Sequence, residues 1–160
     1  MKSGMVFDIK ELTVYEGSGL NVTVFLKGCP LRCQWCHNPE GFELGYVNSK
    51  NGIVGKWYTS EKLVQMLLPY VTLQKHLGGS IIFSGGEPLL QYDFLVETAS
   101  LLQTKIILDT CGYADEEVFR NIFPFVSMIY FDLKIFDDMK HRYYTTKSNT
   151  IIFKNLEQLV

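Results

Sequence analysis

Three of the four cysteines lie close together, at Cys29, Cys33 and Cys36, with the spacing Cys-x3-Cys-x2-Cys. A closed zinc site takes four protein ligands, and a protein-held 4Fe–4S cluster takes four cysteines, one for each iron. Three thiolates on one loop therefore leave one iron of such a cluster without a protein ligand. Because an iron with an open position can bind a substrate, the spacing predicts a catalytic iron–sulfur site.

Two other readings of these cysteines stay open. They could form a zinc site completed by His37 or Cys111, or they could be unpaired structural thiols. Zinc knuckles need a second ligand pair further along the chain, but Cys111 stands alone. His37 adjoins Cys36, which makes it an awkward second ligand for the same ion. A non-catalytic iron–sulfur or zinc-binding module remains the alternative from another functional class.

Composition limits the possible partners and location. The chain has 160 residues, which favours one domain, and its 20% of charged residues is ordinary for a soluble globular protein. The net charge of −2 and the lack of a basic run give no reason to expect nucleic acid as a partner. No apolar run approaches the roughly 20 residues of a membrane span. Three of the four cysteines lie in one loop, which is not the pattern of a disulfide framework. This predicts a reducing, cytoplasmic location.

Four short apolar runs are predicted strands, over residues 21–26, 80–84, 105–109 and 128–133. Helices are predicted between them and after the last one, which implies a parallel sheet with helical crossovers. Residues 42–57 contain glycine and asparagine without periodicity and are predicted to be a connection.

The predicted helices have recognisable ends. The first begins at Thr59 or Ser60, ends at Gly78 and Gly79, and should be kinked or split by Pro69. The others are predicted over residues 92–103 with Asp93 as the cap, over 115–123, over 137–144, and from 149 or 150 to the end of the chain.

Polar residues follow each predicted strand. The cysteines follow the first strand, and the others are Gly85, Gly86, Glu87, Asp109, Asp132 and Lys134. The carboxyl ends of parallel strands meet at one edge of a sheet, so these residues should converge there. Buried charges need partners. Two carboxylates and one ammonium match a zwitterionic amino acid and a small cation, or else an internal salt bridge.

The longer string from Val24 to Glu40, VFLKGCPLRCQWCHNPE, resembles the activases of glycyl-radical enzymes, a family within the radical S-adenosylmethionine (SAM) superfamily that includes pyruvate formate-lyase activating enzyme. The resemblance continues through three further strings, SGGEP at 84–88, LDTCG at 108–112 and FDLK at 131–134. Four motifs in the right order are far more specific than the cysteines alone.

The resemblance implies a fold and an activity. The fold would be one radical SAM core domain over residues 1–160, with about four βα units of a partial (β/α)6 barrel. SAM would chelate the open iron, and one electron would cleave it to methionine and a 5′-deoxyadenosyl radical. That radical would abstract hydrogen from a glycine of a partner enzyme, with a flavodoxin or ferredoxin-type protein as the reductant. A small-molecule radical SAM enzyme is the alternative within the superfamily.

The resemblance also implies roles for individual residues. Cys29, Cys33 and Cys36 would hold the cluster, and no side chain is assigned as a catalytic acid, base or nucleophile. Trp35 would lie near the adenine unless it only packs in the core, and His37 would offer backbone contacts to adenine unless it is simply an exposed loop residue.

The remaining implied contacts concern the methionine end of SAM. Gly85 and Gly86 would let the backbone approach the methionine group, and Glu87 would anchor the loop or bind the amine. Asp109, Asp132 and Lys134 would lie near the methionine moiety and, as in some members, a monovalent cation.

The sequence departs from the family in four respects. One is the segment GSGLN at 17–21, which lacks the arginine that relatives have there. Cys111 stands where relatives commonly have a small polar residue, and we predict a packed thiol there, because a fourth ligand would block SAM. Residues 38–57 contain no cysteine, so the insert that carries extra clusters in many activases is missing. The chain stops after the fourth predicted strand, so we expect the later strands to be missing, the sheet edge to be open and SAM binding to be weak.

Overall fold

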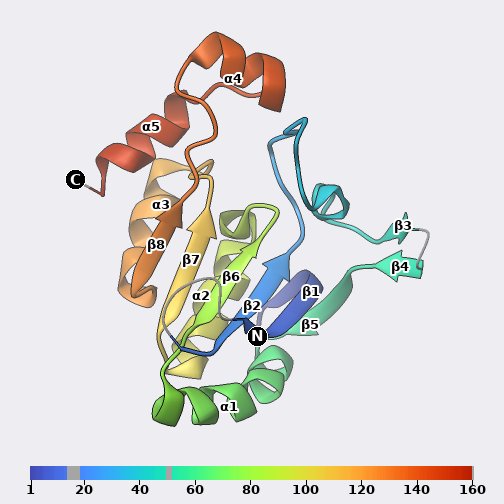
Figure 1. Ribbon diagram of the computed structural model, residues 1–160, viewed down its shortest axis with the longest axis vertical. Coiled ribbons are helices and arrows are strands. Elements are labelled where there is room, and N and C mark those ends of the chain that lie inside the picture. Colours follow the sequence, from blue (N-terminus) through green and yellow to red (C-terminus); the bar gives the residue numbers. More distant parts are fainter. Residues whose placement is uncertain (14–18, 50–51, 160) are drawn as a thin grey trace.

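The computed structural model describes residues 1–13, 19–49 and 52–159. Its centre is a six-stranded sheet with the order β5-β1-β2-β6-β7-β8 (Figure 1). The strands are β1 (Ser3–Thr13), β2 (Asn21–Leu26), β5 (Lys56–Thr59), β6 (Ile81–Gly85), β7 (Ile106–Thr110) and β8 (Met128–Phe131). A separate hairpin pairs β3 (Val47–Ser49) with β4 (Gly52–Val54).

The last four strands of this order, β2, β6, β7 and β8, are parallel. β2 pairs with β6, β6 with β7, and β7 with β8. These are the four predicted strands with small shifts in their bounds, so the predicted α/β class and parallel sheet are confirmed. Alternate residues of β2, namely Val22, Val24 and Leu26, are fully buried in the core shared with the helices, as the two-residue period of a strand requires.

The prediction of a plain connection over residues 42–57 is wrong, and β1 was not predicted. β1 runs antiparallel to both β2 and β5, with Ser3 opposite Thr59 and Met5 opposite Trp57. β5 is a strand because β1 offers it a free edge more than fifty residues away in the chain, and such pairing leaves little local signal. Residues 50 and 51, within the predicted connection, lie outside the described part.

The long helices begin and end largely where their signals predict. They are α1 (Ser60–Leu77), α2 (Tyr92–Leu102), α3 (Glu116–Asn121), α4 (Asp138–Thr145) and α5 (Thr150–Glu157). The Thr59 hydroxyl accepts from the Lys62 amide at 3.2 Å, which confirms the predicted cap, and Gly78 follows the last turn.

One helix prediction is wrong, and one of two alternatives for another is excluded. α1 runs through Pro69 without being split, which leaves a kink as the predicted effect of the proline; packing of its apolar face on the core outweighs one lost hydrogen bond. The cap of α2 is Gln91 rather than Asp93, which lies in the first turn. A short 3-10 helix, Pro88–Gln91, precedes α2, which begins at Tyr92 as predicted. The predicted last helix ends at Glu157, and Val160 lies outside the described residues.

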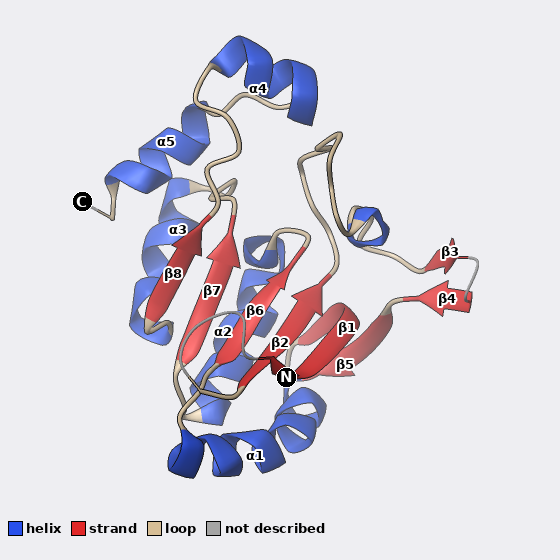
Figure 2. Ribbon diagram, viewed as in Figure 1, coloured by secondary structure: helices blue, strands red, loops and turns tan. Residues whose placement is uncertain are grey.

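Figure 2 shows α2 and α3 behind the sheet and α4 and α5 beyond the ends toward which β7 and β8 point. The helices therefore leave the carboxyl edge of the parallel strands to loops and to α4. Among the helices of residues 1–13, 19–49 and 52–159, none combines the length and apolar character needed to cross a membrane.

The end of α4 carries backbone strain. Thr146 has a left-handed conformation with φ 70°, and its amide donates to the Arg142 carbonyl at 2.9 Å. Glycine is preferred at this position after a helix, and a β-branched residue there is unusual.

We therefore expect Thr146→Gly to raise the free energy of unfolding by about 1 kcal/mol, because it removes the Cβ that the left-handed conformation disfavours. Urea denaturation checks this, with an increased midpoint at an unchanged slope. Thr146→Ala is the control and should gain less, since it keeps the Cβ. An unchanged or lower midpoint for the glycine variant would show that Thr146 is not strained.

Candidate functional site

A cavity of about 330 Å³ lies at the carboxyl edge of the parallel strands. All the residues predicted for the site line it except Glu87: Cys29, Cys33, Trp35, Cys36, His37, Gly85, Gly86, Asp109, Asp132 and Lys134. The loops after β2, β6, β7 and β8 each contribute to its wall. The predicted convergence of these loops is thus present in the structure.

The three cysteines of the loop share one wall of the cavity. Cys33 is buried, Cys29 and Cys36 are half-buried, and they pack with Leu31 and Cys111. The start of the loop is held by the Cys29 amide, which donates to the Phe42 carbonyl at 2.9 Å.

The thiols suit a soft metal. Burial raises the pKa of Cys29 to about 12 and also raises the pKa of Cys33, where Lys134 opposes the shift. These thiols therefore hold their protons until a metal displaces them. Within the described ranges, no three His, Cys, Asp or Glu side chains converge on a single ion. A 4Fe–4S cluster does not need such convergence, because each thiolate binds a different iron.

Two cations that the sequence reasoning missed brace the cysteine loop. The Arg32 guanidinium donates to the Cys29 carbonyl at 2.5 Å and pairs with Glu43 at 2.7 Å. Lys27 is fully buried, and its ammonium donates to the Glu40 carbonyl at 2.5 Å. Burial lowers the pKa of Lys27, while the charges of Glu40 and Glu43 oppose this shift. Both residues lie within the cysteine motif, and this position is the only sequence signal for them.

Gly85 and Gly86 bring the loop after β6 against the cysteine loop. The Gly86 amide donates to the Leu26 carbonyl at 2.8 Å, and the next amide donates to the Gly28 carbonyl at 2.7 Å. A Cβ on Gly86 would lie 2.2 Å from the Gly28 oxygen, and Gly85 has φ 115°. The two glycines thus allow the turn after β6 to approach the backbone of the cysteine loop closely, and they also line the cavity.

Glu87 lies behind the cavity wall instead of on it. Its carboxylate is fully buried and accepts from the Thr110 hydroxyl at 2.7 Å and from the Cys111 amide at 3.0 Å. The Cys111 thiol and the Leu89 amide also donate to it. Burial raises the pKa of Glu87, and these four hydrogen bonds oppose that shift. Of its two predicted roles, the contacts support the loop anchor.

Cys111 is a packed thiol in this structure. It is buried beside Leu31 and Cys33, and its sulfur lies 3.0 Å from a Glu87 oxygen. Burial raises its pKa well above the usual value, and the nearby Glu87 charge adds to the shift. Cys111 lines the cavity as well, but unlike the other three thiols it donates to a buried carboxylate, and this contact supports the predicted role of a packed thiol.

Three charged residues, Asp109, Asp132 and Lys134, line the same cavity as the cysteines. The Ser84 hydroxyl donates to Asp109 at 2.6 Å, and Lys134 forms an ion pair with Asp132. Burial lowers the pKa of Lys134, but the hydrogen bond and charge of Asp132 outweigh it and the pKa is raised. The predicted internal salt bridge is therefore present, and it faces the cavity, where both groups can exchange partners with a ligand.

Trp35 and His37 lie at the mouth of the cavity. Trp35 is 44% exposed, and its ring centroid lies 5.9 Å from that of Tyr144. This exposure excludes plain core packing, the alternative considered for Trp35. His37 is exposed as well. Tyr144 was not predicted, since no local pattern reveals a contact made across more than one hundred residues.

Comparison with known proteins gives the class. A family model described as Radical SAM superfamily matches residues 23–160. The chain therefore belongs to the radical SAM superfamily, whose members use a 4Fe–4S cluster and SAM.

Relatives with similar sequences indicate a family within this superfamily. Trans-4-hydroxy-L-proline dehydratase activating enzyme from Clostridioides difficile is 28% identical over 207 aligned positions, which cover 97% of this chain and 68% of the relative. The 4-hydroxyphenylacetate decarboxylase activating enzyme from Clostridioides difficile strain CD196 is 30% identical and covers 98% of this chain, with 67% of its own length matched. These alignments are longer than the chain, so they contain gaps opposite insertions in the relatives. The resemblance to activases of glycyl-radical enzymes is confirmed.

A solved structure supports the fold alone. The crystal structure of QueE from Escherichia coli superposes with a TM-score of 0.51 and is 18% identical, over 69% of this chain and 53% of that one.

The contact between the glycine turn and the cysteine loop leads to a prediction. Gly86→Ala should displace the loop, because its Cβ would overlap the Gly28 carbonyl. We expect a loss of about 1–3 kcal/mol of stability and at least a severalfold loss of iron binding. Gly45→Ala is the matched control, since a Cβ there meets nothing within 4 Å. Normal iron content in Gly86→Ala would show that the loop does not depend on this contact.

Proposed function

We propose that this protein is an activating enzyme that binds a 4Fe–4S cluster at Cys29, Cys33 and Cys36, cleaves SAM, and generates a glycyl radical on a partner enzyme. The observation that carries the proposal is the cavity itself. Three thiols of one loop and the Asp132–Lys134 pair line the same cavity. Relatives named as activating enzymes of a dehydratase and a decarboxylase support the same reaction.

The cavity can hold the amino acid end of SAM. Ligand pockets typically run from about 300 to 1,000 Å³, so its volume of about 330 Å³ suits one small molecule. Lys134 is placed to bind a carboxylate, and Asp109 and Asp132 to bind an ammonium group or a monovalent cation. Trp35, exposed at the mouth, offers an aromatic face to an adenine.

The chain supplies the cluster ligands and the groups that orient SAM. When bound, the cluster provides the electron that splits SAM into methionine and a 5′-deoxyadenosyl radical. Cys29, Cys33 and Cys36 would hold the cluster, while Cys111 donates to Glu87. Lys134 and Asp132 would bind the methionine end of SAM within the cavity.

Further parts of the proposal concern the cellular context. A flavodoxin or ferredoxin-type protein would deliver the electron, since low-potential clusters need a reductant. The buried free thiols favour a reducing cytoplasm. We also treat residues 1–160 as one radical SAM core domain, because a single sheet joins the strands on both sides of the cysteine loop.

The cluster assignment predicts distinct cysteine variants. Alanine at Cys29, Cys33 or Cys36 should abolish the absorbance near roughly 400 nm of anaerobically reconstituted protein, because each thiolate holds one iron. Cys111→Ala should keep that absorbance. Iron and sulfide analysis should give about four of each per chain. A single zinc, or loss of the cluster in Cys111→Ala alone, would contradict the assignment.

The SAM site predicts a loss of affinity. Lys134→Ala should weaken SAM binding by roughly 10- to 100-fold, because a charge-assisted hydrogen bond is lost. Calorimetry on reduced, reconstituted protein measures this. Lys140→Ala removes the same charge from an exposed position outside the cavity and serves as the control. Equal affinity for SAM in the two variants would show that Lys134 has only a structural role.

The activity itself is tested by incubation with SAM, a reductant and candidate glycyl-radical enzymes under anaerobic conditions. The expected result is the EPR doublet of a glycyl radical on the partner. If 5′-deoxyadenosine forms without any radical on the partner, a small-molecule radical SAM enzyme becomes the better description. If neither forms, the proposal fails.

A further inference from the structure

We propose that the carboxyl end of α4 positions Cys33, and that His141 and Thr145 hold this end of the helix in place. The inference rests on the proposed function in so far as Cys33 is a cluster ligand. It assigns His141 and Thr145 as positioning residues, since neither lines the cavity.

The first observation concerns the middle of the cysteine loop. The Arg32 amide donates to the Thr145 carbonyl at 2.8 Å, and the Gln34 amide donates to the Tyr144 carbonyl at 3.1 Å. These two amides flank Cys33. The other backbone bonds found for the loop lie at its start or, from Cys36 to Cys33, within it. The backbone on both sides of Cys33 is thus fixed by a helix more than one hundred residues away.

The helix end is suited to this contact. The last carbonyls of an α-helix lack partners within the helix, and they carry the negative end of its dipole. α4 stops at Thr145, and the Thr146 amide turns back to the Arg142 carbonyl. The carbonyls of Tyr144 and Thr145 therefore remain available to accept from the loop.

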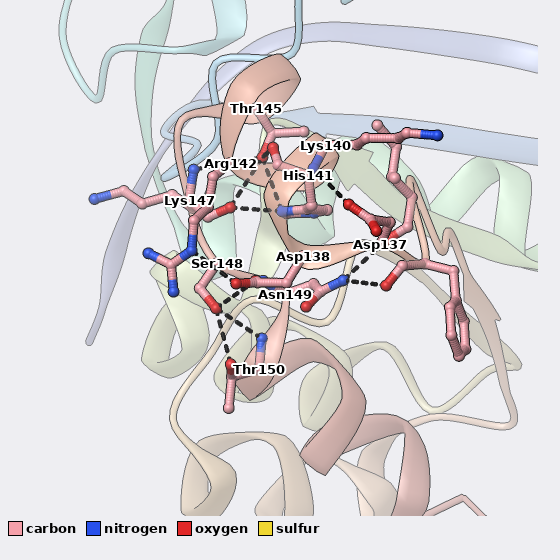
Figure 3. A network of polar contacts seen from close by, with 12 residues as sticks. Asp137, Asp138, Lys140, His141, Arg142, Thr145, Lys147, Ser148, Asn149 and Thr150 are labelled. Atoms are coloured by element: carbon pink, nitrogen blue, oxygen red, sulfur yellow. Dashed lines mark hydrogen bonds and ion pairs between the residues drawn. The ribbon is translucent and has the colours of Figure 1, made fainter.

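A buried histidine fixes the turn that ends α4. His141 is fully buried, and its Nδ1 lies 2.6 Å from the Lys147 carbonyl and 3.0 Å from the Thr145 hydroxyl (Figure 3). A carbonyl only accepts, so Nδ1 carries a proton and donates to Lys147. The Thr145 hydroxyl in turn donates to the His141 carbonyl at 2.8 Å. Together, these bonds tie the last turn of α4 to the segment that follows it.

Two asparagines connect this unit to the sheet. The Asn149 amide group donates to the Phe136 carbonyl at 2.7 Å, in the segment between β8 and α4. The Asn155 amide group donates to the carbonyls of Gly112 and Ala114 at 2.8 Å, in the loop that follows β7. A continuous set of bonds therefore runs from the end of β7 through α5 and α4 to the Arg32 and Gln34 amides. The position of Cys33, which lies between these two amides, depends on this set of bonds.

The test compares His141→Ala with two controls. His141→Asn keeps a donor near the position of Nδ1, and Met139→Ala changes a residue of α4 that is 80% exposed. The first readout is hydrogen–deuterium exchange of the Arg32 and Gln34 amides in the full chain without metal. The second is the rate at which a chelator removes iron from the reconstituted protein.

We expect His141→Ala to speed both exchange and iron loss by roughly tenfold, as the loss of a buried hydrogen bond allows. Amides of β2 and β6 should exchange as before. His141→Asn should stay close to the wild type, and Met139→Ala should match it. Unchanged exchange at Arg32 and Gln34 in a folded His141→Ala protein would overturn the inference.

Two further outcomes are also decisive. If His141→Ala exposes the β2 and β6 amides too, Thr145→Val provides the milder variant, and its failure to speed exchange at Arg32 and Gln34 would overturn the inference. If the wild-type protein binds no cluster, the proposed function fails, while the exchange measurements still decide whether α4 holds the loop.

Discussion

The structure depends on one backbone contact, in which the turn after β6 meets the start of the cysteine loop. The amides of Gly86 and Glu87 donate to the carbonyls of Leu26 and Gly28, and the lack of a side chain on Gly86 makes the approach possible. This contact places the three thiols above the carboxyl edge of the sheet. Every other part of the site is arranged around that position.

Buried polar groups then hold the surrounding loops at fixed separations. The Glu87 carboxylate joins the turn after β6 to the end of β7, with all its described partners being donors. Lys27 and Arg32 bind carbonyls of the cysteine loop and of the segment after it. Burying such groups is unfavourable unless they are paired. Their pairing gives the cavity a definite shape before any ligand arrives.

The sequence predicted what local patterns encode. The apolar runs identified β2, β6, β7 and β8, and the position of each polar motif after a strand placed most of the site residues around one cavity. β5 was missed because it pairs with β1 across more than fifty residues, whereas β1 also pairs with its neighbour β2 and was missed although that partner is close in the chain. The loop-anchoring role of Glu87 was one of two predicted alternatives, but its burial behind the wall and the contact of α4 with Arg32 and Gln34 depend on tertiary packing and were not predicted.

The central claim is that three thiolates leave one iron free for SAM, while the Cys111 thiol remains hydrogen-bonded to Glu87. Mössbauer spectroscopy of protein reconstituted with isotope-enriched iron, with and without SAM, tests it most directly. One of the four irons, about a quarter of the spectral area, should change its parameters when SAM is added. A spectrum in which no iron responds, or in which all four irons respond alike, would contradict the account.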